Sequence, residues 1–211
     1  MSQSRPLLQM RFNPETLMPA DILAGRNIDP EAKFGPAIRA ITGGYTNHNA
    51  LFVINQNPAI APRGAIVIGD TTPPEAAPAP LSKYEDLINA GTYIVRVWRV
   101  KDMSDEERLS VSSMWWLYSN HHPYPGRSVK RLWIMRLVNH LPYEIPGRWC
   151  TRNSFIPFGH VLPPKRNPMM RPDGVMKKNP TPRTPENRLV AGILEDVTDE
   201  VCIHIPQGEV R

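Results

Sequence analysis

Two residues in this chain, His48 and Cys150, have side chains whose types and settings suit covalent chemistry. His48 follows a Gly-Gly turn and precedes an apolar run, residues 50–54, that is rich in strand-forming residues. Cys150 follows a loop, lies between Arg148 and Arg152, and is placed to begin a short helix. A cysteine becomes a nucleophile as its thiolate, which a histidine, a cation or a helix N-terminus stabilises. Together the two residues would supply a nucleophile and a general base for acyl transfer.

Each residue also has a purely structural interpretation. Taken singly, His48 is typical of a turn histidine without a role, and Cys150 is typical of a small buried apolar residue. A third group commonly orients a catalytic histidine. Glu75 follows the second predicted strand, so a loop could return its carboxylate to His48, and Asp70 is the weaker candidate for the same position.

The pattern of the chain predicts the elements that must position these residues. A short antiparallel hairpin over residues 50–54 and 65–68 carries His48, and a loop over residues 70–80 follows it. Ser104 and Glu107 form a capping box that opens a helix running to about residue 118. Further predicted elements are helices over residues 35–41, 81–89 and 128–140, a strand over residues 93–100 and an alternating strand over residues 201–205.

Composition indicates one globular domain with a Pro-rich extension. The chain has 211 residues, 41% of them apolar, and no apolar run reaches the length of about 18 residues that would predict a membrane span. Residues 163–188 contain seven Lys or Arg and two acids, and the rest of the chain contains 18 of each sign. The net charge of +5 therefore belongs to the Pro-rich segment, which disfavours a folded nucleic-acid-binding face.

We therefore predict a domain over residues 1–162, a Pro-rich basic linker or arm over residues 163–188, and a strand-containing extension over residues 189–211. The arm is a candidate for wrapping a protein partner in an assembly. The N-terminus lacks the pattern of a secretory signal, so we expect cytoplasmic synthesis, with association with a virion as a further location. The two cysteines make no disulfide framework, and we expect reduced thiols, although the sequence leaves one bridge open.

The histidines give no metal-binding pattern. Adjacent side chains at His121 and His122 point apart, and no cysteine or acid spacing links them and His140 into a ligand set. We predict neither a metal nor a cofactor.

An ordered series of short motifs does resemble a known family. The series is Met18-Pro-Ala-Asp-Ile-Leu23, Gly35-Pro-Ala-Ile-Arg-Ala-Ile-Thr-Gly43, Tyr45-Thr-Asn-His-Asn-Ala-Leu-Phe-Val53, Val95-Arg96, Pro123-Tyr124 and Trp149-Cys150-Thr151. It is similar to the circularly permuted papain-like hydrolases of the YiiX/YebB-like branch of the NlpC superfamily, which are related to lecithin retinol acyltransferase. The resemblance covers residues 17–160, and the order of the motifs carries it rather than any single one.

The resemblance implies an α+β, papain-like fold in which a small antiparallel sheet packs with helices. It implies a cysteine peptidase or amidase, with Cys150 as nucleophile, His48 as general base and Glu75 as the orienting residue. Peptidoglycan peptides are the leading substrate class, and lipid esters or amides come next. Tyr45 is a candidate for the oxyanion site, although the backbone N–H of Cys150 is the better donor if a helix begins there.

Three features of the sequence depart from the family pattern. Ala20 stands where the family often has glycine, and Thr151-Arg152 stands where it often has a Ser-Glu pair. Pro157 is expected to limit the helix after Cys150 to about two turns. These departures leave open a second function of another class, namely a structural or assembly protein that keeps the fold without catalysis.

Overall fold

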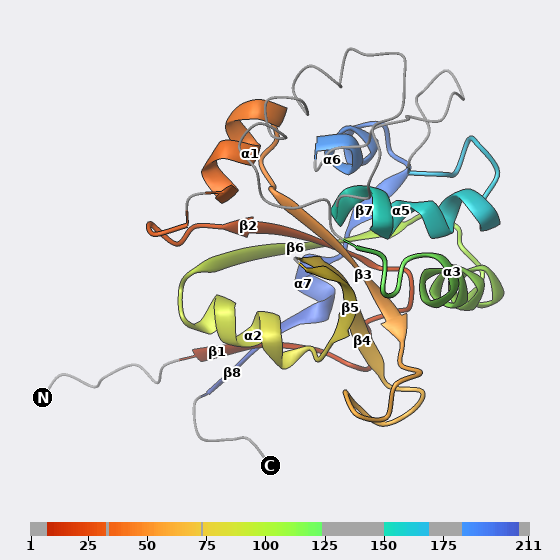
Figure 1. The fold of residues 1–211 in the computed structure, drawn as a ribbon, viewed down its shortest axis with the longest axis horizontal. Coiled ribbons are helices and arrows are strands. Elements are labelled where there is room, and N and C mark those ends of the chain that lie inside the picture. The colour runs from red at the N-terminus through yellow and green to blue at the C-terminus, as the bar shows by residue number, and fades with distance from the viewer. Residues whose placement is uncertain (1–7, 33, 73, 124–149, 169–182, 207–211) are drawn as a thin grey trace, which may run out of the picture.

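The computed structural model describes residues 8–32, 34–72, 74–123, 150–168 and 183–206 (Figure 1). Its strands are β1 (Leu8–Phe12), β2 (Ile22–Asn27), β3 (His48–Ile54), β4 (Ile66–Thr72), β5 (Glu75–Ala79), β6 (Tyr93–Val100), β7 (Leu194–Asp196) and β8 (Cys202–Pro206). Its helices are α1 (Phe34–Thr42), α2 (Ser82–Asn89), α3 (Asp105–Tyr118), α5 (Cys150–Val161), α6 (Arg183–Val190) and α7 (Thr198–Val201). None of the described helices is long and apolar enough to cross a membrane.

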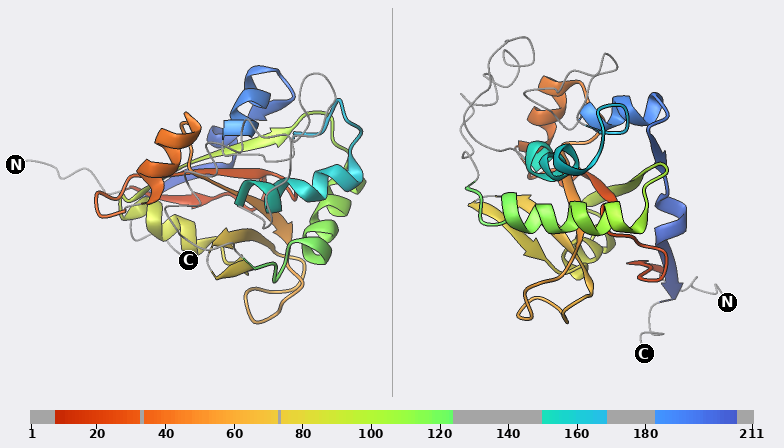
Figure 2. Two further views of the ribbon diagram at one scale, coloured as in Figure 1. Left: turned by 45° about the horizontal axis from the view of Figure 1, so that its top comes forward. Right: turned by 90° about the vertical axis from the view of Figure 1, so that its right-hand side faces the viewer.

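The main sheet is antiparallel and has the strand order β5-β4-β3-β2-β6-β7, while β1 and β8 pair in a separate ladder. Side chains alternate across β3, so that Leu51 and Val53 enter one core cluster and Ala50 and Phe52 enter another. Helices α3 and α5 supply the first cluster, and β1, α2 and α7 supply the second. The sheet therefore lies between two layers (Figure 2), and the predicted α+β class is confirmed.

Most elements predicted around the site are present. The hairpin is β3 and β4, paired antiparallel with Phe52 opposite Ile68. Helix α2 and strand β6 occupy the predicted ranges, and α3 begins at the Ser104–Glu107 capping box, both of whose hydrogen bonds form. The strand predicted from the alternation near residue 203 is β8. The helix predicted over residues 128–140 lies outside the described residues.

Two local predictions are wrong. Residues 70–80 were expected to form a loop, but β4 extends to Thr72 and β5 adds a further strand that contains Pro78. A proline is tolerated in β5 because this strand is at the edge of the main sheet, where the N–H at its position is not needed for the ladder with β4. Pro157 does not shorten α5, which runs through it from Cys150 to Val161.

The C-terminal segment is part of the fold. Strand β7 pairs with β6 at one edge of the main sheet, and β8 pairs with β1, so that Leu8 lies opposite Pro206. Helix α6 includes residues predicted to belong to the linker, and residues 169–182 of that predicted arm lie outside the described residues. The extension predicted from residue 189 onward thus supplies strands to both sheets.

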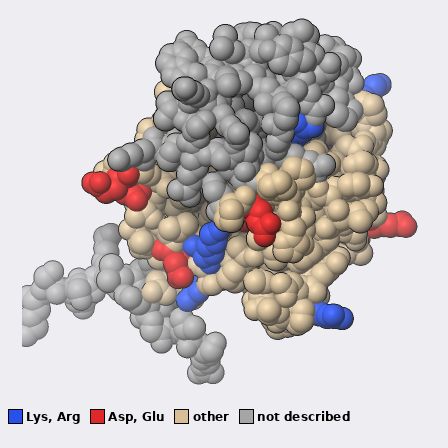
Figure 3. All heavy atoms as spheres, in the orientation of Figure 1, with Lys and Arg blue, Asp and Glu red and all other residues tan. Residues whose placement is uncertain are grey.

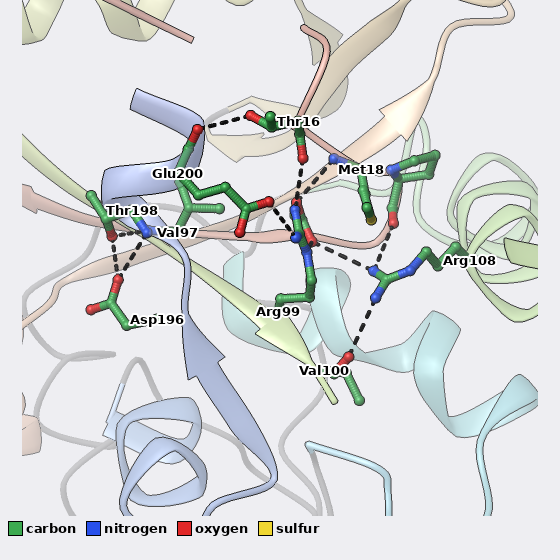
Figure 4. Close-up of polar contacts among 11 residues, drawn as sticks. Thr16, Met18, Val97, Arg99, Val100, Arg108, Asp196, Thr198 and Glu200 are labelled. Atoms are coloured by element: carbon green, nitrogen blue, oxygen red, sulfur yellow. Dashed lines mark hydrogen bonds and ion pairs between the residues drawn. The ribbon is translucent and has the colours of Figure 1, made fainter. Parts of the chain in front are cut away.

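A buried ion pair joins the residue before β2 to strand β6, and Figure 4 shows the polar contacts around it. Arg99 of β6 donates to both carboxylate oxygens of Asp21, at 2.8 and 2.7 Å, and also donates to the Thr16 carbonyl and to Glu200 of α7. Arg108 of α3 approaches the same carboxylate at 3.5 Å. Burial raises the pKa of Asp21 although both guanidinium groups oppose that shift.

The backbone conformation of Ala20 is one that glycine adopts more easily than alanine. Its φ is +68°, in the left-handed region that favours glycine, and its side chain is fully buried. The conformation lets the backbone N–H of Ala20 donate to the Phe52 carbonyl while Phe52 donates to the Asp21 carbonyl. The turn into β2 is therefore held against β3, the strand that carries His48.

We predict that Arg99→Met lowers the free energy of unfolding by about 3–5 kcal/mol, because it leaves the buried Asp21 carboxylate without its main partner. The matched control is Arg96→Met, which breaks an ion pair between Arg96 and Asp196 at the surface and should cost less than about 1 kcal/mol. Urea unfolding followed by circular dichroism measures both variants. Equal losses in the two variants would contradict the prediction.

Candidate active site

His48 and Asp70 form a buried pair on the face of the sheet that α2 covers. His48 begins β3 and Asp70 lies in β4, one residue beyond the Leu51–Gly69 pair of the register. This register makes the two residues diagonal neighbours on one face. The His48 Nε2 lies 2.8 Å from Asp70 Oδ1, and both side chains are almost entirely buried. The N–H on Nε2 donates to the carboxylate, so Nδ1 is the ring nitrogen free to meet another group.

Helix α2 completes the surroundings of Asp70. Lys83 donates to the second carboxylate oxygen at 2.5 Å, and its side chain is 40% exposed. The ring of Tyr84 stacks beside that of His48, with centroids 6.3 Å apart, and burial together with the nearby Asp70 carboxylate raises the pKa of Tyr84. A carboxylate with this many donors stays ionised although it is buried: His48 and Lys83 outweigh burial and hold the pKa of Asp70 well below its usual range.

Cys150 is the first residue of α5, as predicted, and its side chain is buried. The His48 imidazole and the backbone N–H of Asn49 lie close enough to the thiol to lower its pKa, and its Sγ lies 3.9 Å from Thr151 Oγ1. The first N–H groups of a helix have no partner within the helix and carry a partial positive charge. Histidine, backbone donors and helix terminus thus surround one sulfur atom.

The electrostatics of the site favour a charged pair. Burial disfavours imidazolium, but Asp70 and Cys150 overcome it and raise the pKa of His48 to about 10. Burial likewise disfavours a thiolate, but His48, Asn49 and Thr151 lower the pKa of Cys150. Between these two pKa values the thiolate–imidazolium form is the populated one. Cys202 shows the opposite behaviour, since burial and the neighbouring carboxylates raise its pKa to about 12, and both cysteines are free thiols.

The structure brings Cys150 and His48 together but does not bring Glu75 to them. Glu75 begins the edge strand β5, and its carboxylate lies 3.2 Å from Nδ1 of His121, in an exposed pair. The carboxylate that contacts His48 is Asp70, which the sequence suggested only as the weaker candidate. The reason is the length of β4: the strand continues to Thr72, so Asp70 keeps the alternation of the strand and faces His48.

Tyr45 has partners other than an oxyanion site. Its ring is 46% exposed and lies under the Arg26 guanidinium, 4.6 Å from the ring centroid. Its backbone N–H donates to Glu186 of α6, which also accepts from the backbone N–H and the hydroxyl of Thr46. Arg148, predicted beside Cys150, lies outside the described residues, whereas Arg152 is described and has its pKa lowered by burial.

Sequence reasoning missed Lys83, Tyr84, Asn49 and Glu186. Lys83 and Tyr84 carried a weak signal, because they lie in the first turn of the helix that follows β5, and this turn brings Lys83 to Asp70. Asn49 carried a weaker one, as the polar residue next to His48 in an otherwise apolar strand. Glu186 carried none, since its contact with Tyr45 and Thr46 depends on how the C-terminal segment returns to the domain.

The face drawn in Figure 3 has no large charged patch, and the described residues include no cluster suited to a metal ion. In Figure 3, the Lys, Arg, Asp and Glu side chains drawn in colour are scattered over the visible face and form no continuous patch of one sign. Within the described ranges, no group of three or more His, Cys, Asp or Glu is arranged to hold a metal ion.

Comparisons with known proteins identify a fold. No family model and no curated protein matches this sequence. The crystal structure of metalloprotein yiiX from Escherichia coli O157:H7 matches with a TM-score of 0.55 and 13% identity, over 86% of this chain and 97% of that one. The chain has a YiiX-like fold. At this identity the likeness concerns the fold alone, and it confirms that part of the predicted resemblance.

We predict that Asp70→Asn slows alkylation of Cys150 by iodoacetamide at pH 6.5 by about tenfold or more, in a Cys202→Ala background. Without the negative charge of Asp70, the pKa of His48 falls and the thiolate loses its imidazolium partner. In the parent protein, the alkylation rate should rise as the pH passes the lowered pKa of Cys150 and then stay level. It should change again at a pH of about 10, where His48 deprotonates.

Glu75→Gln is the matched control, because it removes a carboxylate of the same sheet that contacts His121 instead of His48. It should leave the alkylation profile unchanged. The assignment of Asp70 as the orienting residue fails if Glu75→Gln has the larger effect.

Proposed function

We propose that this protein is a cysteine hydrolase or acyltransferase that acts on an amide or ester bond. The observation that supports the proposal best is the contact of the Cys150 thiol with His48, whose other ring nitrogen lies 2.8 Å from Asp70. A nucleophile, a base and a group that orients the base are the parts that acyl transfer requires.

Acylation starts from the thiolate–imidazolium pair, in which the Cys150 proton resides on His48 Nδ1. The sulfur attacks the substrate carbonyl carbon, and the carbonyl π electrons move to the oxygen. When the tetrahedral intermediate collapses, the C–N or C–O bond breaks and His48 returns its proton to the leaving amine or alcohol. Asp70 keeps the ring in one tautomer and orientation throughout, and Lys83 and Tyr84 keep Asp70 in place.

Deacylation repeats these steps with water or an acceptor alcohol. His48 takes a proton from the incoming nucleophile, which attacks the thioester carbonyl, and the C–S bond breaks to restore the Cys150 thiolate. The backbone N–H of Cys150, at the N-terminus of α5, is the proposed donor to the oxyanion in both half-reactions. Tyr45 is not given this role, because its ring stacks with Arg26 and its backbone N–H is bound to Glu186.

The substrate class rests on resemblance. The order of motifs along the chain is similar to that of the permuted papain-like hydrolases, and the YiiX-like fold agrees with that resemblance. We propose peptidoglycan peptides as the leading substrates and lipid esters or amides as the next class. Action on a cell wall would suit a virion component that carries its own hydrolase.

One observation favours a second candidate, a non-catalytic assembly protein. Cys150 is only 6% exposed and His48 only 8%, so both lie below the surface in this state. Without catalysis, the same charged network would serve to hold α5 on the sheet. The experiment below separates the two functions.

We predict that Cys150→Ala reduces hydrolysis of peptidoglycan peptides and acyl esters to background, at least about 10³-fold below the wild type, since no other group of the site can form the acyl-enzyme. Because the substituted side chain is small and buried, the fold should persist. Mass spectrometry of the wild-type protein mixed with substrate should show an acyl adduct on Cys150.

Cys202→Ala is the control, since Cys202 belongs to β8 and its raised pKa makes it a poor nucleophile. This variant should keep full activity. Turnover by Cys150→Ala equal to that of the wild type would end the proposal, and an absence of turnover on every substrate by both proteins would favour the assembly protein.

A further inference from the structure

The first turns of α5 are bound to one residue of β3, Asn49. The hydroxyl of Thr151 donates to Asn49 Oδ1 at 2.9 Å, and the hydroxyl of Ser154 donates to the Asn49 carbonyl at 3.1 Å. The backbone N–H of Asn49 also lies near the sulfur of Cys150 and lowers the pKa of that thiol. Two hydrogen bonds to one residue therefore hold the helix that begins with the candidate nucleophile.

This link lies in the interior. Asn49, Thr151 and Ser154 are all fully buried, although each has a polar side chain. Burying polar side chains is unfavourable unless they are hydrogen-bonded. Apolar residues alone would therefore hold α5 on the core at a lower cost in desolvation free energy. Farther along, α5 does pack through Phe155 and Phe158 against the apolar cluster of the sheet. The polar contacts are confined to the end of the helix where Cys150 lies.

Apolar packing and hydrogen bonds constrain a helix differently. The hydrophobic effect is non-directional, so Phe155 and Phe158 fix α5 on the sheet but tolerate small rotations and slides. Hydrogen bonds of this geometry tolerate far less displacement. Asn49 is the chain neighbour of His48, so a bond from Asn49 to the helix relates the position of Cys150 directly to that of the imidazole.

We infer that Asn49 is a positioning residue. Its hydrogen bonds with Thr151 and Ser154 fix the start of α5 relative to β3, and this places the Cys150 thiol next to His48. The inference rests on the proposed Cys150–His48 chemistry and adds the residues that set its geometry. An error of about 1 Å in such a pair is enough to cost an enzyme a large part of its rate.

The test compares four variants in a Cys202→Ala background by the pH dependence of iodoacetamide alkylation. Thr151→Val removes the donor with little change in shape, and Asn49→Ala removes the acceptor while the Thr151 hydroxyl stays. Both should slow labelling of Cys150 at pH 6.5 by about tenfold, since one buried hydrogen bond is lost, and both should approach the parent rate at pH 9.5. Thr151→Ser keeps the hydroxyl and should restore the parent profile.

Ser119→Ala is the fourth variant and the matched control for stability. Ser119 is a buried residue that follows α3, and its hydroxyl donates to the Asn153 carbonyl of α5 at 2.8 Å, away from β3. It removes one buried hydrogen bond to the same helix and should leave the alkylation profile unchanged. If Thr151→Val fails to fold, Ser154→Ala, which removes only the second contact with Asn49, takes its place and should slow labelling in the same direction.

The outcomes separate this inference from the proposed function. An ordinary thiol profile in the parent protein itself would overturn the proposed function. A parent profile that persists at low pH, together with unchanged profiles in Thr151→Val and Asn49→Ala, would overturn the inference alone. A shift in Thr151→Val without one in Asn49→Ala would also overturn it, because the Thr151 hydroxyl would then act directly on the sulfur 3.9 Å away.

Discussion

The fold depends on the buried bidentate pair of Asp21 and Arg99. It joins the turn before β2 to β6, and the same guanidinium reaches Glu200 of α7 and the Thr16 carbonyl. Two charges taken out of water are costly, and this pair is tolerated because the donors and acceptors around it are matched. Through the backbone bonds of Ala20 and Asp21 to Phe52, the pair also sets where β3 lies. Asp21 lies just before β2, at the opposite end of the β2–β3 ladder from His48. By fixing β3 there, the ion pair also affects the position of His48 at the start of that strand.

The candidate site also contains a buried carboxylate with cationic partners, Asp70, but its electrostatics differ from those of Asp21. Asp70 is as deeply buried as Asp21, yet its pKa is lowered where that of Asp21 is raised. Asp70 faces a histidine that lies beside a thiol, so its negative charge favours proton transfer from sulfur to nitrogen. Lys83 of α2 binds the same carboxylate and helps to keep it ionised.

The sequence predicts the elements well where local signals agree. The capping box of α3, the strand-rich run of β6 and the placement of Cys150 at the start of α5 are all found in the structure. The sequence also pointed to the proposed nucleophile and base, Cys150 and His48, because the chain has only two cysteines and six histidines, and the structure places these two residues close together. Glu75 was expected beside His48, but Asp70 lies there, because the end of β4 has no breaker: Thr71 and Thr72 continue the strand past Asp70, and the Pro-rich residues that suggested a loop form an edge strand. The role of Asn49 depends on a helix distant in sequence, which no local pattern encodes.

The return of the C-terminal segment to both sheets has a consequence for folding. Strand β1 can pair only after β8 has formed, and β6 remains an open edge until β7 arrives. Pairing between segments so far apart in sequence requires closure of a very long loop. The entropy of the chain is lost before the new contacts stabilise the structure, so proteins of this topology fold slowly. During synthesis, the site could assemble from residues 48–161 while the β6 edge still lacked its neighbour. An exposed strand edge at that stage pairs readily with other chains. Strand β7, which is synthesised well after β6, would therefore protect the nascent protein against aggregation when it covers this edge.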